Sequence, residues 1–287
     1  MIILVLGSSG QLGMCLKDQL DKKSDDIFYK EKSEINIEDF ANTKKELLKL
    51  QPDIIVNAAA YTAVDLAEKN FDQANLINHL SVDNLAKIAK KINSTLIHVS
   101  TDYVFDGESS NPYKESARTN PKTVYGMTKL NGEKSIIRSK CKHVIIRTSW
   151  LFSEYNNNFF KTMLNLAKKN KEITVVSDQY GTPTYAQDLA KAIKKIIYKI
   201  SINHEVHGIF HYGGNSTCSW SDFASEIFKQ SLLNTSVKPI STEEFKTHAI
   251  RPVNSSLDSN KLFMSYDIMS SNWKKGISQA LKKIKNL

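Results

Sequence analysis

Tyr125 and Lys129 are the residues of this chain whose types and spacing point most directly to chemistry. They are four positions apart, and residues at that spacing lie on one face of a helix, where both can contact one bound molecule. A free phenol titrates near ~10, so a tyrosine that transfers protons at neutral pH needs a nearby positive charge to lower its pKa. The pair is short and also fits an exposed helix face, so its meaning depends on the elements around it.

A glycine-rich turn near the beginning of the chain gives the pair a context. Gly7, Gly10 and Gly13 follow an apolar run at residues 2–6 and open a predicted helix. Glycines at such a turn let the backbone approach a pyrophosphate, and the helix N-terminus favours its negative charge. The spacing is Gly-x-x-Gly-x-x-Gly rather than Gly-x-Gly-x-x-Gly, so a plain turn is the alternative. Together with Tyr125 and Lys129, the turn indicates nicotinamide redox chemistry.

The second predicted strand ends in a charged run, Tyr29-Lys30-Glu31-Lys32. A site for NAD usually has an acid near this strand end, where it binds the hydroxyls of the adenosine ribose. Lys30 instead suits the 2′-phosphate of NADPH, although a solvated charge cluster explains the run equally well. The sequence therefore favours NADPH and leaves NADH open.

Strands and helices alternate along most of the chain. Apolar runs rich in β-branched residues predict strands at 2–6, 27–29, 53–57, 95–100 and 143–148. The segments between and after them predict helices at 11–20, 39–50, 72–92, around Tyr125, at 185–198 and at 220–229. Buried strands separated by helices are typical of a parallel sheet covered on both faces. We therefore expect an α/β fold, a Rossmann-like doubly wound parallel sheet with a smaller, interleaved α/β substrate domain.

The alternation becomes less regular beyond about Val176, which sets the expected domain boundary. We place a dinucleotide-binding domain at residues 1–176 and a mainly substrate-binding domain at 177–287. The boundary is approximate and the first domain is expected to be discontinuous, because no Pro-rich linker separates the two parts.

Composition narrows the class of protein. The chain has 287 residues, 41% of them hydrophobic, which is typical of a soluble globular protein with a large core. No apolar run approaches the ~20 residues of a membrane span, and the N-terminal run lacks the basic flank of a signal peptide. We expect a cytoplasmic protein with no membrane partner.

The net charge of +9 comes from scattered lysines, without the aromatic interleaving of a nucleic-acid platform. A positive surface of this kind suits a small polyanion such as a nucleotide-diphosphate sugar, so no nucleic acid is expected. The three cysteines are widely spaced, and His204 and His207 are one residue short of the helical zinc spacing. We expect no metal site.

Six segments together resemble the dTDP-4-dehydrorhamnose reductase family of extended short-chain dehydrogenase/reductases. They are residues 7–13, 57–65 (NAAAYTAVD), 100–105 (STDYVF), 124–129 (VYGMTK), 147–150 (RTSW) and 178–184 (DQYGTPT). The resemblance continues to residues 251–255 and covers most of the chain. The combination is far more specific than any one of its motifs.

The resemblance implies a cofactor cleft that begins at the glycine turn. Residues of the turn hold the pyrophosphate, and residues after the second, third and fourth strands border the adenine and line the rest of the cleft. The cofactor residues at these matching positions are Gly7, Gly10, Gln11, Leu12, Gly13, Asp39, Phe40, Ala60, Tyr61, Thr62 and Val99. Lys30, Tyr125 and Lys129 complete the set.

The resemblance also implies which side chains meet the sugar. Tyr125 transfers the proton, and Lys129 bridges the phenol and the nicotinamide ribose. Thr101 and Asp102 contact the sugar at the end of the fourth strand, the edge at which doubly wound sheets bind ligands. A strand-end capping hydroxyl is the alternative for Thr101, and a core position is the alternative for Trp150, which would pack on the substrate.

Arg251 stands out because it is one of only four arginines in a lysine-rich chain, and proline follows it. A planar guanidinium suits a diphosphate or a pyrimidine, whereas an ordinary surface charge is the alternative. We include Arg251 among the expected substrate-binding residues.

These roles imply an NADPH-dependent oxidoreductase that reduces the C4 keto group of dTDP-4-dehydro-L-rhamnose to give dTDP-L-rhamnose. The product would enter a bacterial surface polysaccharide such as the O-antigen of lipopolysaccharide. A reductase of another nucleotide-linked 4-keto-6-deoxy sugar and a non-catalytic NADP-binding regulatory subunit stay open. Related dehydratases need a glutamate where this chain has Tyr103, so dehydration is disfavoured.

The residue at position 15 determines what we expect of the protein's assembly and of its dependence on magnesium. Family members that form a magnesium-bridged dimer carry a glutamate two residues after the third glycine, where this chain has Cys15. Magnesium prefers hard oxygen ligands, so a thiol is a poor substitute. We expect activity without added magnesium, and a monomer or a weak homodimer.

Overall fold

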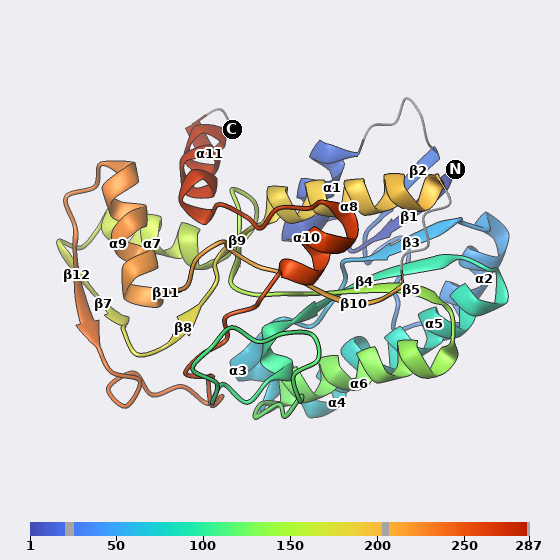
Figure 1. Cartoon of the computed structure of the whole chain (residues 1–287), viewed down its shortest axis with the longest axis horizontal. Helices are drawn as coiled ribbons and strands as arrows, with labels where there is room; N and C mark the ends of the chain where they lie inside the picture. Colours follow the sequence, from blue (N-terminus) through green and yellow to red (C-terminus); the bar gives the residue numbers. More distant parts are fainter. Residues whose placement is uncertain (21–25, 203–206, 286–287) are drawn as a thin grey trace.

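A six-stranded parallel sheet forms the centre of the protein, as a computed structural model shows for all residues except 21–25, 203–206 and 286–287 (Figure 1). The strands lie in the order β10-β5-β4-β3-β1-β2, and every neighbouring pair is parallel. Their bounds are β1 (Ile2–Leu6), β2 (Asp26–Lys30), β3 (Ile54–Asn57), β4 (Thr95–Thr101), β5 (Lys142–Thr148) and β10 (Gly208–Tyr212). The expected α/β fold is confirmed.

Helices cover both faces of this sheet because alternate strand residues point to opposite sides. Ile3 and Val5 pack in one core with helices α1 (Gln11–Gln19), α8 (Ala186–Ser201) and α10 (Asn260–Tyr266). Leu4 and Leu6 pack in another with α2 (Phe40–Leu50), α5 (Ser81–Lys91) and α6 (Val124–Ser139). Figure 1 shows α1, α8 and α10 above the sheet and α5 and α6 below it. Buried apolar residues on both faces explain the continuous hydrophobic runs of the strands.

The strand order reverses direction between β1 and β3. From β1, the chain moves outward to β2 and then returns to β3 on the other side of β1. In doubly wound sheets, a ligand binds outside the carboxyl ends of the strands at such a reversal. The residues that follow β1 and β3 are the glycine turn and the segment beginning Ala58-Ala59-Ala60.

A separate core lies beside the sheet, where α7 and α9 stand in Figure 1. We call it the second core, to distinguish it from the apolar layers on the two faces of the sheet. It contains Phe160, Phe223 and Trp273, and it joins α7 (Phe159–Ala167), α9 (Trp220–Ser231) and α11 (Trp273–Lys285) to strand β7 (Glu172–Val176). β7 pairs in parallel with β12 (Ser236–Ile240). Two shorter pairings join β11 (Cys218–Ser219) to β8 (Tyr180–Gly181) and β6 (Leu151–Phe152) to β9 (Thr184–Tyr185).

Segments from both halves of the chain contribute to one face of the sheet and to the second core. α8, β10 and α10 follow residue 176 and pack with the sheet, while Phe152 and α7 precede it and pack in the second core. The division into 1–176 and 177–287 stays a prediction. Within the described ranges, none of the helices combines the length and apolar character that a membrane span needs. His204 lies outside the described residues.

The long helix predicted at 72–92 is interrupted. It begins as α4 (Phe71–Asn75), passes through a π-helical turn, η1 (Leu76–Leu80), and continues as α5. The Ser81 hydroxyl donates to the Leu76 carbonyl at 2.8 Å, which provides a partner for a backbone group of the wider turn. Turns of this kind inside helices often mark functional positions. Two short elements complete the fold, α3 (Val64–Ala67) and the 3₁₀ turn η2 (Asp102–Val104).

Candidate active site

A cavity of about 470 Å³ lies at the carboxyl edge of the sheet. Its walls come from the glycine turn, the ends of β4 and β5, the beginning of α6 and the second core. The expected site residues among its lining are Gly10, Gln11, Leu12, Ala60, Thr62, Val99, Thr101, Asp102, Tyr125, Lys129, Trp150 and Arg251. The structure therefore brings the expected catalytic and substrate residues together with part of the expected cofactor set.

The glycine turn is held in a conformation that side chains would disturb. Gly7 has a φ of 75°, and a Cβ placed on it would lie 2.7 Å from the Ala59 nitrogen. A Cβ on Gly13 would collide with the carbonyl oxygen of Gly7. α1 begins directly after the turn, and no side chain caps its first turn. This cradle leaves a helix N-terminus facing the cavity, which suits an anion.

Three buried side-chain oxygens in the cavity wall have no hydrogen-bond partner among the described residues. They are Gln11 Oε1, Asp102 Oδ2 and Thr148 Oγ1. Buried polar atoms are rarely left without partners, because desolvation without a hydrogen bond is costly. Their position indicates that a bound polar molecule completes the site.

Tyr125 and Lys129 lie on the first turns of α6, whose N-terminus is capped by the Thr123 hydroxyl. Burial raises the pKa of Tyr125, and a hydrogen bond with Thr101 offsets only part of the rise. The expected lowering of this pKa by a neighbouring lysine is therefore not what the structure shows. The reason is that the Lys129 ammonium is directed to the backbone, donating to the Val99 carbonyl at 2.6 Å.

Lys129 is itself an unusual lysine, because it is 2% exposed. Burial lowers its pKa to about 8, and the carboxylate of Glu133 opposes that change. Perturbed groups of this kind in a cavity are typical of sites that transfer protons.

Thr101, Asp102 and Tyr103 follow one another at the end of β4. The Thr101 hydroxyl donates to Asp102 Oδ1 at 2.8 Å and accepts a hydrogen bond from the Tyr103 backbone at 3.2 Å. Burial raises the pKa of Asp102 to about 6, although hydrogen bonds from Ser255 and Thr101 favour its charged form. Thr101 thus both caps a turn and reaches the cavity, so the two alternatives considered for it are compatible.

Arg251 lies at the side of the cavity with its guanidinium already engaged. It donates to Asp65 Oδ2 at 2.6 Å and to the Tyr103 hydroxyl at 3.3 Å. The ring of Tyr103 in turn meets that of Tyr125 edge to face, with centroids 5.6 Å apart.

An aromatic wall closes the side of the cavity next to the second core. The rings of Trp150 and Trp220 are stacked with centroids 3.5 Å apart and planes 5° from parallel, and Phe159 lies beside Trp220 at 4.5 Å. Trp150 has a φ of 46°, and its indole packs on Gly181, where a Cβ would collide with the ring. The indole of Trp150 is therefore fixed in place before any ligand arrives.

Comparison with known proteins identifies the family. The family model for the RmlD substrate binding domain matches residues 1–286. A dTDP-4-dehydrorhamnose reductase of Aggregatibacter actinomycetemcomitans is 40% identical over 288 residues, which is 96% of each chain. The chain belongs to the dTDP-4-dehydrorhamnose reductase family.

Two solved structures carry the same fold over nearly the whole chain. A dTDP-4-dehydrorhamnose reductase of Clostridium acetobutylicum has a TM-score of 0.94 and 37% identity, covering 99% of this chain and 100% of its own. The enzyme of Bacillus anthracis, solved in complex with NADP, has a TM-score of 0.94 and 35% identity, covering 98% and 99%.

A second cavity of about 370 Å³ also borders the glycine turn. The expected cofactor residues along it are Gly7, Gly10, Ala60, Tyr61 and Thr62. Four expected cofactor residues, Gly13, Lys30, Asp39 and Phe40, are outside the lining of both cavities. Lys32 lines the second cavity and forms an ion pair with Glu38.

Two of these outlying residues have another side-chain contact. Lys30 forms an ion pair with Glu34 at 2.8 Å, and Asp39 caps α2 by accepting a hydrogen bond from the Asn42 backbone at 2.9 Å. Phe40 is 38% exposed at the first position of that helix. Their roles toward a cofactor stay predictions.

Asn78 is a residue of this reductase fold that the sequence reasoning missed. It lies on the π-helical turn η1 and exchanges hydrogen bonds with the backbone of Tyr61, at 2.9 and 3.1 Å. Its amide also donates to Thr128 of α6 at 3.2 Å. Asn78 thereby joins the cofactor-side loop to the helix that carries Tyr125. The wider turn that places it leaves no signal in hydrophobic periodicity.

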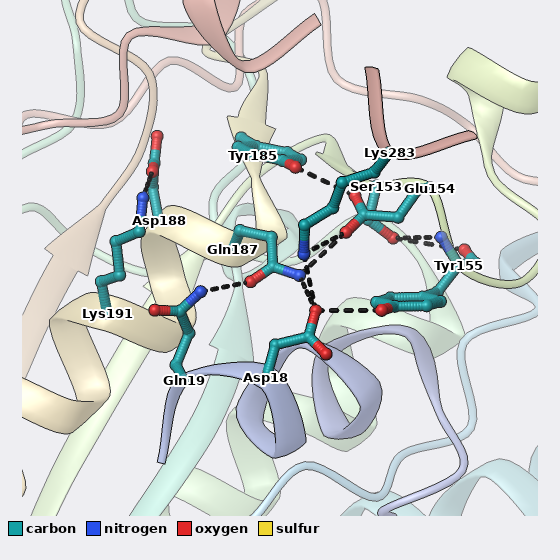
Figure 2. Close-up of polar contacts among 10 residues, drawn as sticks. All are labelled: Asp18, Gln19, Ser153, Glu154, Tyr155, Tyr185, Gln187, Asp188, Lys191 and Lys283. Atoms are coloured by element: carbon teal, nitrogen blue, oxygen red, sulfur yellow. Dashed lines mark hydrogen bonds and ion pairs between the residues drawn. The ribbon is translucent and has the colours of Figure 1, made fainter. Parts of the chain in front are cut away.

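Charged side chains from three segments of the chain meet between α1 and α11. Figure 2 shows Lys283 of α11 reaching between Asp18 of α1 and the loop residue Glu154, with ion-pair distances of 2.6 and 3.0 Å. Gln187 of α8 donates to Glu154 Oε1 at 2.8 Å. Cys15 is buried beside them, and burial and the carboxylates raise the pKa of its thiol. An ammonium between the two carboxylates and a protonated thiol do not fit a divalent cation.

Proposed function

We propose that this chain is an NADPH-dependent reductase of the C4 keto group of dTDP-4-dehydro-L-rhamnose, giving dTDP-L-rhamnose for a bacterial surface polysaccharide. The observation that carries the proposal is one cavity lined by the glycine turn, Thr101, Tyr125 and Lys129. The turn and the unpartnered Gln11 and Thr148 atoms fit a dinucleotide at the end of β1. NADPH, when bound there, supplies a hydride to the keto carbon.

The side chains stabilise the oxygen that becomes an alkoxide. Tyr125 donates its phenolic proton to that oxygen, forming a hydroxyl group and leaving a phenolate. Thr101 donates a second hydrogen bond after its hydroxyl turns away from Asp102, which accepts it at 2.8 Å. Lys129 lies four residues after Tyr125, and its ammonium stabilises the phenolate by charge.

The aromatic wall and Arg251 bind the rest of the substrate. Trp150 presents a fixed apolar surface against which a 6-deoxy sugar can pack. Arg251 presents a planar guanidinium, suited to the diphosphate or the pyrimidine, at the side of the same cavity. Asp65 and Tyr103 hold the guanidinium in position.

A panel of keto-sugar nucleotides tests this proposal. We expect the purified protein to oxidise NADPH most efficiently, as kcat/KM, with dTDP-4-dehydro-L-rhamnose. A higher kcat/KM with a different 4-keto-6-deoxy sugar nucleotide would move the assignment to that sugar. Binding of NADPH without single-turnover oxidation on any keto sugar would favour the regulatory subunit.

Lys30 is expected to set part of the preference for NADPH by pairing with the 2′-phosphate. An exposed charge contact contributes on the order of 1 kcal/mol or less, and Lys30→Asp both removes this attraction and adds a repulsion, so the NADPH/NADH ratio of kcat/KM should shift by about tenfold. The change in kcat should be small. Steady-state kinetics with both cofactors measure the ratio.

Lys32→Asp is the matched comparison. Lys32 lines the second cavity beside the glycine turn, whereas Lys30 pairs with Glu34. A ratio that moves in Lys32→Asp and stays constant in Lys30→Asp would assign the 2′-phosphate to Lys32 instead. Glu34→Gln should strengthen the effect of Lys30 by releasing its ammonium.

We further propose a monomer or weak homodimer that works without added magnesium. Chelator treatment should leave both kcat and the light-scattering mass unchanged, because the Lys283 ammonium already forms ion pairs with both Asp18 and Glu154. The double variant Cys15→Glu/Lys283→Met, which restores oxygen ligands, is the comparison in which a magnesium effect could emerge. Loss of a dimer of the unmodified chain on chelation would contradict the proposal.

A further inference from the structure

A buried string of polar side chains links the cofactor-side loop to Lys129. Asn57 ends β3, His98 lies in the middle of β4, and Lys129 lies on α6. The Asn57 amide nitrogen is 3.1 Å from His98 Nδ1, and His98 Nε2 is 3.2 Å from the Lys129 nitrogen. Asn57 and His98 are fully buried, so protein groups alone decide which atoms carry hydrogen.

The first bond of the string fixes the orientation of the Asn57 amide. The backbone N–H of Ala59 donates to Asn57 Oδ1 at 3.1 Å. Reversing the amide would place two N–H groups against each other, so its NH₂ group must face His98. Nδ1 of His98 therefore accepts a hydrogen bond and carries no hydrogen.

The second bond fixes the tautomer of the ring. Burial and the charge of Lys129 both lower the pKa of His98, so the imidazole is neutral. A neutral imidazole carries one hydrogen, and with Nδ1 as acceptor it must be on Nε2. The Nε2–H bond then points at the amine of Lys129.

We propose that Asn57 fixes His98 as the Nε2–H tautomer, and that His98 is thereby a positioning residue that makes Lys129 a readier proton donor. An N–H directed at an ammonium opposes its positive charge and favours the neutral amine, which can accept that N–H. This inference rests on the proposed reductase function, in which Tyr125 must regain a proton after each turnover. In that step, an N–H bond of Lys129 breaks and the O–H bond of Tyr125 forms.

Other charged groups near Lys129 either raise its pKa or are already paired with one another. Glu133, one turn further along α6, favours the ammonium. Arg147 of β5 donates to both Glu133 oxygens, at 2.9 and 2.7 Å, and the Ser100 hydroxyl donates to one of them at 2.5 Å. Asp102 also lines the cavity. Burial outweighs Glu133 and lowers the pKa of Lys129 to about 8.

The tautomer can be observed directly by nuclear magnetic resonance on protein labelled with ¹⁵N in its seven histidines. His211 is an internal control, because its Nδ1 lies 2.9 Å from the Tyr113 carbonyl oxygen and must carry the hydrogen. Burial and Arg147 lower the pKa of His211 to about 3, so it too is neutral. We expect Nε2–H for His98 and Nδ1–H for His211. Nδ1–H on His98 would overturn the proposal.

Asn57→Asp should reverse the donor and acceptor roles in the hydrogen bonds of His98, and a carboxylate has almost the same shape as an amide. A carboxylate accepts hydrogen bonds from both Ala59 and His98 Nδ1, so His98 should become the Nδ1–H tautomer and turn a lone pair toward Lys129. The alkaline limb of kcat/KM for ketone reduction should then move upward by about one pH unit or more. If the tautomer of His98 changes and the alkaline limb of kcat/KM does not move, the positioning role of His98 is wrong. If the limb moves and the tautomer does not change, the added charge alone causes the effect, which also overturns that role.

His98→Gln is the conservative variant. Its amide offers an oxygen to Asn57 and an N–H to Lys129, so we expect the limb to stay within a few tenths of a pH unit of its original position. A shift as large as that of Asn57→Asp would contradict the inference. The histidine spectrum needs no substrate, so it still decides the tautomer if the reductase assignment fails or if Asn57→Asp does not fold.

Discussion

Tyr125→Phe should lower kcat by about 10²–10⁴-fold, because the substitution keeps the ring and removes the group that protonates the alkoxide. The affinity for NADPH, measured by isothermal titration calorimetry, should stay within a few-fold. Tyr125 is half-buried on α6, and its ring packs edge to face on Tyr103, a contact that phenylalanine preserves. The expected loss is therefore chemical rather than structural.

Lys129→Met provides the comparison for this experiment. It should reduce both kcat and cofactor affinity, because the ammonium is expected to hold the ribose as well as to stabilise the phenolate. A Tyr125→Phe enzyme with near-normal kcat, in an assay limited by the chemical step, would mean that the proton comes from another group. Asp102 would then be the next residue to test, since its pKa of about 6 allows it to carry a proton.

Arg147→Met should lower the free energy of unfolding by about 3–5 kcal/mol, because it leaves a buried carboxylate without its partner. The Arg147 and Glu133 side chains are 3% and 1% exposed, and two hydrogen bonds join them. The guanidinium also lies over the ring of Phe105, 5.1 Å from its centroid. Chemical denaturation followed by circular dichroism measures the change.

Two further variants test whether the lost stability comes from the unpaired buried charge of Glu133 or from the loss of an ion pair in itself. The double variant Arg147→Met/Glu133→Leu removes both charges and should recover much of the loss. Lys87→Met breaks an exposed pair with Asp83, in which the lysine side chain is 69% exposed, and should change stability by about 0–1 kcal/mol. An Arg147→Met protein as stable as Lys87→Met would refute the assigned role of this pair.

The central sheet could be predicted from the sequence because its strands are short apolar runs bounded by turns. All five predicted strands are present, from β1 to β5. The sixth, β10, was missed because His211 and Tyr212 interrupt its apolar pattern. His211 is buried there only because Arg147 and the Tyr113 carbonyl provide its polar contacts. These polar partners come from segments distant in the sequence, so the burial of His211 cannot be predicted from its neighbours in the chain.

The centre of the candidate site was also predictable, because its residues end consecutive strands or begin the helix after them. Thr101, Tyr125 and Lys129 lie in one cavity for this reason. Trp220 and Phe159 were missed, since they belong to helices of the second core and reach the cavity only through tertiary packing. Lys283 was missed for the same reason, because it meets Asp18 from the opposite end of the chain.

The stacked indoles have a practical consequence. The chain has three tryptophans, and two of them, Trp150 and Trp220, line the candidate active site. Trp273 lies in the second core, where its indole N–H donates to Ser216 at 2.8 Å. Indole emission responds to what lies against the ring and is quenched by energy transfer to reduced nicotinamide. The protein thus contains its own optical reporter, and in Trp273→Phe the whole indole signal would come from the aromatic wall of the cavity.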